Sequence, residues 1–358
     1  MKRIPLAAML LTLLGGHAHA ETDNSTLTLY GLADVYVEGL KGATRLARVQ
    51  SGGLAGSRFG VRGREDLGSG LSALFTFESG VNLDDGSYGQ GAFWGRQAFV
   101  GLRSPSGQLT LGRQYSSLFA LTSDFSAFSN TAVGASTAVI GGFGGYEPVR
   151  GSLVSATGNG GPARVNNSIK LESASMAGLK VGAMMGLGEV AGGTNGTRLV
   201  DLYVRYGARP WDVLVSVVSD RSADTALNVR TVSAAAAFTS GGYRALAGVI
   251  DVDDRSGRDN DGRGYWVGGD YRFGGRHLVR AQYVVNRARG LNEGRTRGLG
   301  AGYQLDLSKR TALYASLAHF TNDGNGYADR WAGGGISGLT TGSDRSVTQG
   351  AAGMRHQF

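Results

Sequence analysis

Hydrophobic and polar residues alternate with a period of two along many short stretches of this chain. Between residues 26 and 38 one set of positions is small or apolar, comprising Leu27, Leu29, Gly31, Ala33, Val35 and Val37. The intervening positions include Thr26, Thr28, Asp34, Tyr36 and Glu38. The same alternation recurs near residues 58–64, 71–78, 211–217, 265–273 and 279–286. It predicts β-strands that each have one apolar and one polar face.

The connections between these segments alternate between short and long. Short turns are expected at residues 68–70, 104–107, 207–210, 240–242, 274–275 and 306–309. Long polar connections are expected at residues 39–57, 81–95, 116–165, 188–199, 220–228, 252–262, 287–297 and 321–346. Short turns at one end and long loops at the other are typical of outer-membrane β-barrels. Eight long loops, each joining two strands, predict about sixteen strands.

The polar strand faces need an aqueous environment. A barrel of about sixteen strands is too wide for its side chains to fill, so its interior is expected to hold water. A soluble β-sandwich would also alternate, but its connections would be more uniform in length. The fold class predicted here is therefore all-β: a transmembrane antiparallel β-barrel with apolar residues facing lipid.

Composition agrees with this fold and excludes several kinds of site. The 358 residues include 61 glycines and 5 prolines but no cysteine, which excludes disulfides and thiolate metal sites. The formal charge is +8, and it falls to +6 without the first twenty residues, which hold Lys2, Arg3 and no acid. Most basic residues are scattered singly along the predicted strands, which argues against a nucleic-acid partner.

The first twenty residues have the pattern of a secretory signal peptide. Lys2 and Arg3 precede an apolar run at residues 4–14, and Ala18-His19-Ala20 provides a small-x-small cleavage site. The apolar run is too short to span a bilayer as a helix. The sequence therefore predicts a cleaved signal peptide at residues 1–20 and one barrel domain at residues 21–358.

Several stretches resemble the trimeric general porins of Gram-negative outer membranes. They occur in the family's order along nearly the whole chain, at residues 27–31 (LTLYG), 57–68 (SRFGVRGREDLG), 111–115 (LGRQY), 164–169 (RVNNSI), 308–311 (SKRT) and 353–358 (GMRHQF). The resemblance implies passive diffusion of small hydrophilic solutes and ions, with no cofactor. It also implies a homotrimer in contact with outer-membrane lipid and lipopolysaccharide. The terminal Phe358 corresponds to the residue by which the family engages the barrel-assembly machinery.

The resemblance further implies that a long third loop, residues 116–163, folds inward and narrows the pore. In the family, acidic residues on this loop face arginines on the opposite wall. Carried over position by position, Arg58, Arg96 and Arg164 match the wall arginines, and Arg62 matches a basic position beside them. Period-two alternation independently places Arg58 and Arg62 on the polar face. Arg113 shares the parity of Leu109 and Leu111 and is a weaker candidate.

The third loop departs from the family pattern because it is rich in glycine, alanine and serine. Its only acids are Asp124 and Glu147. A sparse acidic side leaves the arginines less balanced, which predicts a mildly anion-favouring pore. The alternative is that these arginines form structural ion pairs with nearby acids such as Glu65, Asp66 or Glu78.

Other functions are weaker interpretations of the same sequence. A substrate-selective channel would use a ladder of binding groups in the same lumen. An outer-membrane hydrolase would need a serine and a histidine within hydrogen-bond reach, but only His277, His319 and His356 follow the signal peptide. A surface adhesin would not explain why arginines are predicted to line the lumen. The acidic stretch 251–261 lacks the ligand spacing of a calcium loop, so no metal is expected.

Overall fold

A computed structural model gives the fold. It describes residues 25–42, 44–129, 131–137, 163–188, 198–221, 228–256, 261–289, 293–324 and 346–358. Glu147 and the predicted signal peptide lie outside the described residues. Within the described ranges, no helix has both the length and the apolar character needed to cross a membrane.

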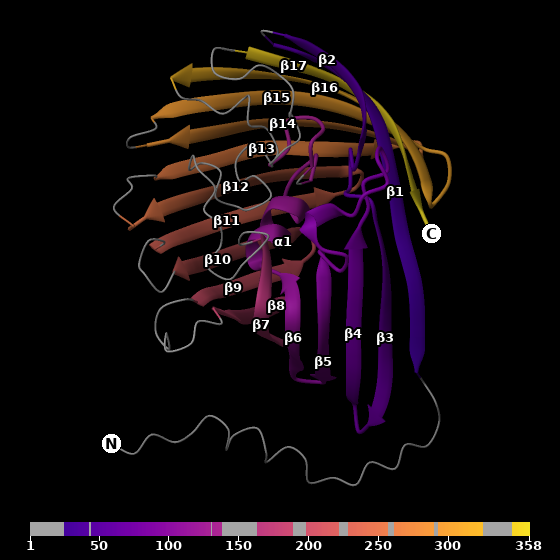
Figure 1. Cartoon of the computed structure of the whole chain (residues 1–358), viewed down its shortest axis with the longest axis vertical. Coiled ribbons are helices and arrows are strands. Elements are labelled where there is room, and N and C mark those ends of the chain that lie inside the picture. Colours follow the sequence, from indigo (N-terminus) through magenta and orange to yellow (C-terminus); the bar gives the residue numbers. More distant parts are fainter. Residues whose placement is uncertain are drawn as a thin grey trace.

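The described strands form one closed antiparallel sheet (Figure 1). Strands that follow one another in sequence pair as neighbours, and β1 pairs with β17 to close the barrel. The strand segments are β1 (Thr26–Lys41), β2 (Arg45–Ser51), β3 (Arg58–Gly68), β4 (Leu71–Gly80), β5 (Gln97–Ser104), β6 (Gly107–Tyr115), β7 (Arg164–Ser173), β8 (Leu179–Leu187), β9 (Arg198–Ala208), β10 (Trp211–Arg221), β11 (Asn228–Ser240), β12 (Tyr243–Asp254), β13 (Gly262–Phe273), β14 (His277–Ala288), β15 (Gly294–Asp306), β16 (Thr311–Gly324) and β17 (Ser346–Gln357).

These segments amount to sixteen barrel strands in the described part of the chain. Both β2 and β3 pair antiparallel with β1, β2 along its second half and β3 along its first half. They are two pieces of one strand, interrupted by residues 52–57. The predicted sixteen-stranded β-barrel is therefore confirmed.

The interruption between β2 and β3 is held by one buried carboxylate. Asp34, on an inward position of β1, accepts hydrogen bonds from the backbone N–H groups of Gly53, Leu54 and Ala55 at 3.1, 2.9 and 3.0 Å. The Tyr314 hydroxyl donates to the same carboxylate at 2.5 Å. A completely buried acid is tolerated here because its oxygens are well supplied with donors.

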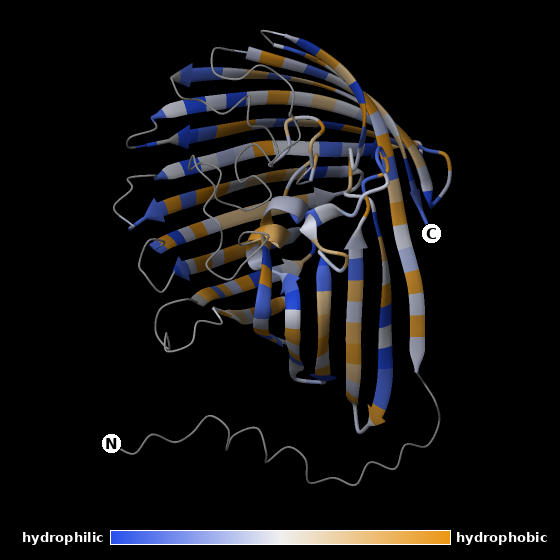
Figure 2. Cartoon of the chain, in the orientation of Figure 1, coloured by the Kyte–Doolittle hydropathy of each residue, from blue (hydrophilic) through white to orange (hydrophobic). Residues whose placement is uncertain are grey.

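The two faces of the wall differ as the alternation predicts, and Figure 2 shows apolar and polar bands alternating along the strands. On the outer face large apolar side chains remain exposed, for example Leu29 and Leu317 at 68% each. Polar residues such as Asp201 and Gln282 point inward and are buried. An apolar outer band facing lipid and a polar interior are the pattern of a transmembrane barrel.

Most predicted connections are found where expected, with two corrections. The region 39–57, predicted to be a long loop, is mostly strand: β1 continues to Lys41, and β2 pairs with it from Arg45. This stretch carries its own alternation, which the prediction overlooked. A further short turn between β7 and β8, at residues 174–178, was also missed.

The start of the third loop lies inside the barrel, as the resemblance implies (Figure 1). Residue Ser116 caps helix α1 (Ser117–Asp124), and residues 125–129 and 131–137 continue along the inner wall. The wall there is apolar: loop side chains including Phe125 and Phe128 pack in one cluster with Leu214, Leu246, Ile250, Trp266, Val284 and Phe320. The interior is therefore partly filled at this level, because loop and wall share a hydrophobic core.

Candidate functional site: the constriction beside helix α1

The buried carboxylate of Glu78 is the centre of the candidate site. Glu78 occupies an inward position on β4, and Arg96 contacts its Oε1 at 2.7 Å through Nε. The hydroxyl of Tyr115 donates to Oε1 at 2.8 Å and that of Tyr30 to Oε2 at 3.0 Å. The Nε atom of Arg58 lies 3.9 Å from Oε2. One carboxylate therefore positions two guanidinium groups and two phenol rings.

A second cluster adjoins the first through Tyr115. Its ring stacks on that of Phe119 with 3.9 Å between centroids and 9° between planes. The guanidinium carbon of Arg164 lies 5.3 Å from the Tyr115 centroid and 5.2 Å from that of Phe119. Arg164 is 3% exposed, and no carboxylate in the described ranges pairs with it. Contacts of this kind with the electron-rich ring faces stabilise a cation that lacks an anionic partner.

Helix α1 is fixed at its first turn by a wall residue. The Ser116 hydroxyl accepts from the Phe119 N–H at 3.4 Å, the usual role of a helix N-cap serine. Asp201 on β9 accepts from the backbone N–H of Ser117 at 2.7 Å and from its hydroxyl at 2.5 Å. An acid at a helix N-terminus also interacts favourably with the helix dipole.

The other end of α1 is held by arginines from two strands. Arg205 on β9 donates to the Asp124 carboxylate at 2.8 Å. Arg244 on β12 donates to the carbonyl of Asp124 at 3.2 Å and to that of Ser126 at 3.4 Å. Because backbone carbonyls at a helix C-terminus lack intrahelical partners, Arg244 satisfies groups that would otherwise be unpaired.

Two glutamines hold the segment after α1 through its backbone. Gln282 on β14 accepts from the Ala127 N–H at 2.8 Å and donates to the Ala135 carbonyl at 2.6 Å. Gln349 on β17 accepts from the Gly134 N–H at 3.1 Å and donates to the Ala132 carbonyl at 2.8 Å. The loop is therefore a fixed part of the channel wall along residues 116–129 and 131–137.

The structure brings Arg58, Arg96 and Arg164 together around Glu78 and Tyr115. Arg62 lies further along β3, where its guanidinium carbon is 5.2 Å from the centroid of the Tyr30 ring. Asp124 lies at the far end of α1, where its carboxylate pairs with Arg205. Glu147 is outside the described residues. The alternative of structural ion pairs holds in part, since Glu78 does pair with Arg96.

Arg113 is placed differently from these arginines. Register pairs it with Ala98 on the face that carries Leu111, in agreement with its parity. Its side chain donates to the Gly95 carbonyl at 2.7 Å and to Asn166.

The aromatic part of this site was not anticipated from the sequence. Tyr115 and Phe119 are four residues apart and flank the N-cap Ser116, so they lie on one side of the first helical turn. The spacing was available in the sequence, but the glycine- and serine-rich composition of the loop gave no sign of a helix. The contacts of Glu78 with arginines and tyrosines depend on the strand register between β3, β4 and β5.

A closed barrel whose interior is narrowed by a loop packed on its inner wall defines a β-barrel channel. The family profile described as Gram-negative porin matches residues 6–325. The chain therefore belongs to the Gram-negative porins. It is an outer-membrane protein of a Gram-negative bacterium, through which small hydrophilic solutes and ions diffuse passively.

Individual porins resemble the chain, two of them over most of its length. Outer membrane porin protein 32 of Delftia acidovorans is 28% identical over 369 residues, which cover 99% of each chain. An outer membrane porin protein of Bordetella pertussis is 42% identical over 133 residues, covering 32% of this chain and 34% of that protein. A solved structure described as an anion-selective porin from Comamonas acidovorans has a TM-score of 0.77 at 25% identity, with 94% of this chain and 100% of that chain covered.

Proposed function

We propose that the pore favours anions mildly and that Arg58, Arg62, Arg96 and Arg164 line its narrow region. The observation that carries this proposal is the imbalance among the described residues at the constriction: Arg58 and Arg96 share the one carboxylate of Glu78, and Arg164 lies beyond it, next to the ring of Tyr115. Rings of charged side chains set ion selectivity in channels, and arginine favours anions. The solved porin from Comamonas acidovorans, which is described as anion-selective, supports the same preference.

In this proposal Asp124 acts on the three arginines only at a distance, because it lies at the end of α1 away from Tyr115. Its carboxylate contacts Arg205 at 2.8 Å, and Arg205 also contacts Asp212 at 2.6 Å. Arg205 therefore shares its charge between two carboxylates and offsets the charge of Asp124 only in part. Glu147 is retained as a proposed pore residue on the family resemblance alone.

The proposal is tested by single-channel recording under a KCl gradient. We expect the wild-type reversal potential to lie on the chloride side, and Arg58→Ser to move it toward potassium. Arg58 suits the test because its side chain is 28% exposed and its contact with Glu78 is 3.9 Å, so Glu78 keeps Arg96 after the change. The matched control is Arg263→Ser. It removes an exposed arginine of β13 that pairs with Asp251 of β12. An unchanged reversal potential in Arg58→Ser would contradict the proposal.

We also propose that the protein catalyses no reaction. The three described histidines contact Tyr303, Thr348 and Thr311 at 2.7, 2.9 and 2.9 Å, respectively. None of these partners is the serine that a hydrolase of the predicted kind would use. No group of three or more potential metal ligands occurs in the described part of the chain. The runner-up is a substrate-selective channel, which saturable flux would distinguish from linear diffusion.

We further propose a homotrimer in the outer membrane. A cluster of aromatic side chains supports it: Phe59 and Phe77, on the outward face of β3 and β4, pack with Phe93 and Trp94 of the following loop at 5.6–5.9 Å. Phe93 remains 55% exposed on this face. Apolar side chains on the outer wall face lipid or a neighbouring subunit, and in this proposal the aromatic cluster contacts a neighbouring subunit. Lipid and lipopolysaccharide are the proposed neighbours elsewhere.

We also propose roles for the two ends of the chain. The signal peptide at residues 1–20 is proposed to be removed on export, and Phe358 is proposed to engage the barrel-assembly machinery. Phe358 exchanges two backbone hydrogen bonds with Gly31, each 3.1 Å long, and is 53% exposed. An exposed aromatic at the end of the last strand suits recognition during assembly.

A further inference from the structure

The stacked rings of Tyr115 and Phe119 form a flat, partly exposed surface at the constriction. Both rings have intermediate exposure, and their planes differ by 9°. Along α1 the buried residues are Ser117, Leu118, Leu121 and Thr122, so Phe119 lies on the opposite, less buried side. Next to it on that side, Ala120 and Ser123 are small and partly exposed. An incoming planar group therefore meets little steric obstruction from α1 itself.

This surface is held in place before any solute arrives. The Tyr115 hydroxyl donates to Glu78 at 2.8 Å, which fixes the ring from the β4 side. Asp201 anchors the first residue of α1 with two hydrogen bonds, which fixes Phe119 from the β9 side. A surface that is already ordered loses little conformational entropy on binding.

A positive charge lies beside the rings. The guanidinium carbon of Arg164 is within 5.3 Å of both ring centroids, and that of Arg96 is 5.8 Å from the Tyr115 centroid. The charge of Arg96 is shared with Glu78, whereas no carboxylate in the described ranges pairs with Arg164. A flat apolar surface and a cation without a carboxylate partner among the described residues are thus within the length of one small aromatic acid.

We propose that this site favours planar aromatic carboxylates over aliphatic anions of the same charge and similar size. The inference rests on the anion preference proposed above and names the solute class for that same constriction. The solute ring stacks against Phe119 in an offset arrangement, while its carboxylate lies in the positive field of the buried Arg164 guanidinium. Aromatic stacking of this kind strengthens association by about twofold to tenfold beyond apolar burial.

The test compares benzoate with cyclohexanecarboxylate, which have the same charge and number of carbon atoms but differ in planarity. Each is added to the trimeric protein in a planar bilayer, and inhibition of the chloride current is titrated. We expect benzoate to inhibit at a concentration about twofold to tenfold lower than cyclohexanecarboxylate. Phe119→Leu, which removes the flat ring but keeps an apolar side chain, is expected to abolish this difference.

Phe238→Leu is the matched control because Phe238 is a partly exposed ring on the outer face of β11, packed against Trp211, and it should keep the wild-type difference. Heat-modifiable migration in gels checks that each variant is folded. Equal inhibition by the two acids in wild type would overturn the inference, as would a difference that survives in a folded Phe119→Leu protein.

A measurement of chloride against potassium selectivity in the same bilayers separates the two proposals. An anion-selective wild type that treats both acids alike overturns only the aromatic preference. A wild type without anion selectivity overturns the proposed function as well.

Discussion

At the scale of single residues, Glu78 controls how much positive charge the constriction presents. It is the one carboxylate within 4 Å of Arg58 and Arg96 among the described residues. We expect Glu78→Gln to increase anion preference, because the two guanidinium groups then lose their negative partner while the shape of the side chain is kept. The reversal potential under a KCl gradient should move further toward that of chloride.

The control for Glu78→Gln is Asp251→Asn. It also removes one negative charge, but from an exposed cluster with Arg263 and Arg289. Its reversal potential should match the wild type. A Glu78→Gln channel that shifts toward potassium would show that Glu78 acts mainly by placing the arginines rather than by neutralising them.

Residue-level prediction from the sequence succeeded where a residue's face is decided by strand parity. Arg58 and Arg62 were placed inward on this basis, and the register of β3 with β1 agrees. Parity cannot say which inward residues meet across strands. The contact between Glu78 and Tyr115 joins residues 37 positions apart, and it depends on the pairing of β4, β5 and β6.

At the scale of elements, the third loop is held through its backbone as well as by packed side chains. Gln282 donates to the Ala135 carbonyl and accepts from the Ala127 N–H, and all three residues are buried. In Gln282→Leu these backbone groups lose their partner, at a cost of about 1–3 kcal/mol for each group left unsatisfied. We expect noisier open-channel current and a changed single-channel conductance, because α1 is no longer held at a fixed distance from the arginines.

Gln50→Leu serves as the comparison for Gln282→Leu. Gln50 is a partly exposed glutamine whose amide lies 3.4 Å from Asp84, away from the third loop. Its current trace should resemble the wild type. Unaltered conductance and noise in Gln282→Leu would mean that the apolar cluster alone is sufficient to hold the loop.

The strands and the third loop explain why sequence patterns predict the barrel but not the contacts of the candidate site. Strands are set by local alternation, so their number and most turns followed from the sequence. The loop is set by contacts between distant segments, such as Trp266 Nε1 donating to the Phe125 carbonyl at 2.6 Å. The inward apolar positions that receive the loop, including Leu246 and Ile250, break the simple rule that inward means polar. Only the presence of the loop explains them.

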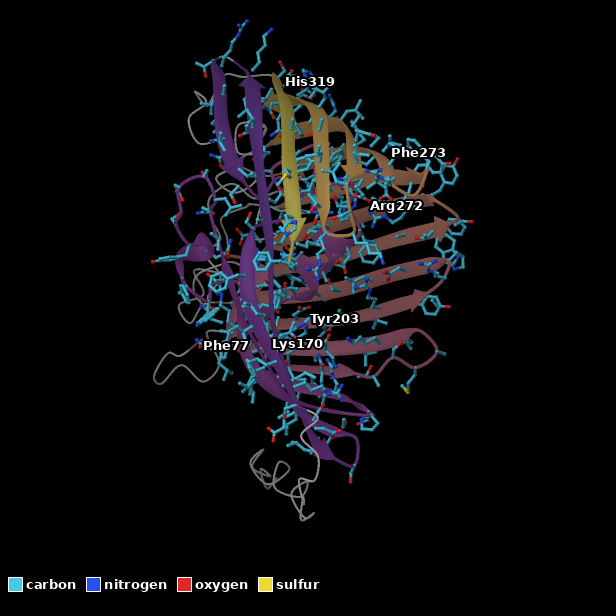
Figure 3. All side chains as sticks on the ribbon, turned by 90° about the vertical axis from the view of Figure 1, so that its right-hand side faces the viewer. Phe77, Lys170, Tyr203, Arg272, Phe273 and His319 are labelled. Atoms are coloured by element: carbon cyan, nitrogen blue, oxygen red, sulfur yellow. The ribbon has the colours of Figure 1, made fainter. Side chains whose placement is uncertain are left out.

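At the scale of the whole molecule, the barrel wall faces lipid on its outer side and water on its inner side. Figure 3 shows side chains projecting from both faces of the barrel. Phe273 and Arg272, which it labels, are consecutive residues near the turn that follows β13, and therefore point to opposite faces. Lys170 and Tyr203, which are also labelled, lie on the inner face, where the Lys170 Nζ atom is 5.6 Å from the centroid of the Tyr203 ring. Alternation therefore assigns each strand residue to lipid or to the lumen.

This division predicts how charge is tolerated across the wall. Leu317 is 68% exposed at the middle of β16 on the lipid face, so Leu317→Arg places a cation in hydrocarbon. The expected cost is about 2–4 kcal/mol near the bilayer midplane, seen as a lower urea midpoint for unfolding from lipid vesicles. Thr76→Arg, at a partly exposed inward position on β4, should leave the midpoint nearly unchanged. If both variants lost the same stability, the outer face of β16 would have to be covered by something other than lipid.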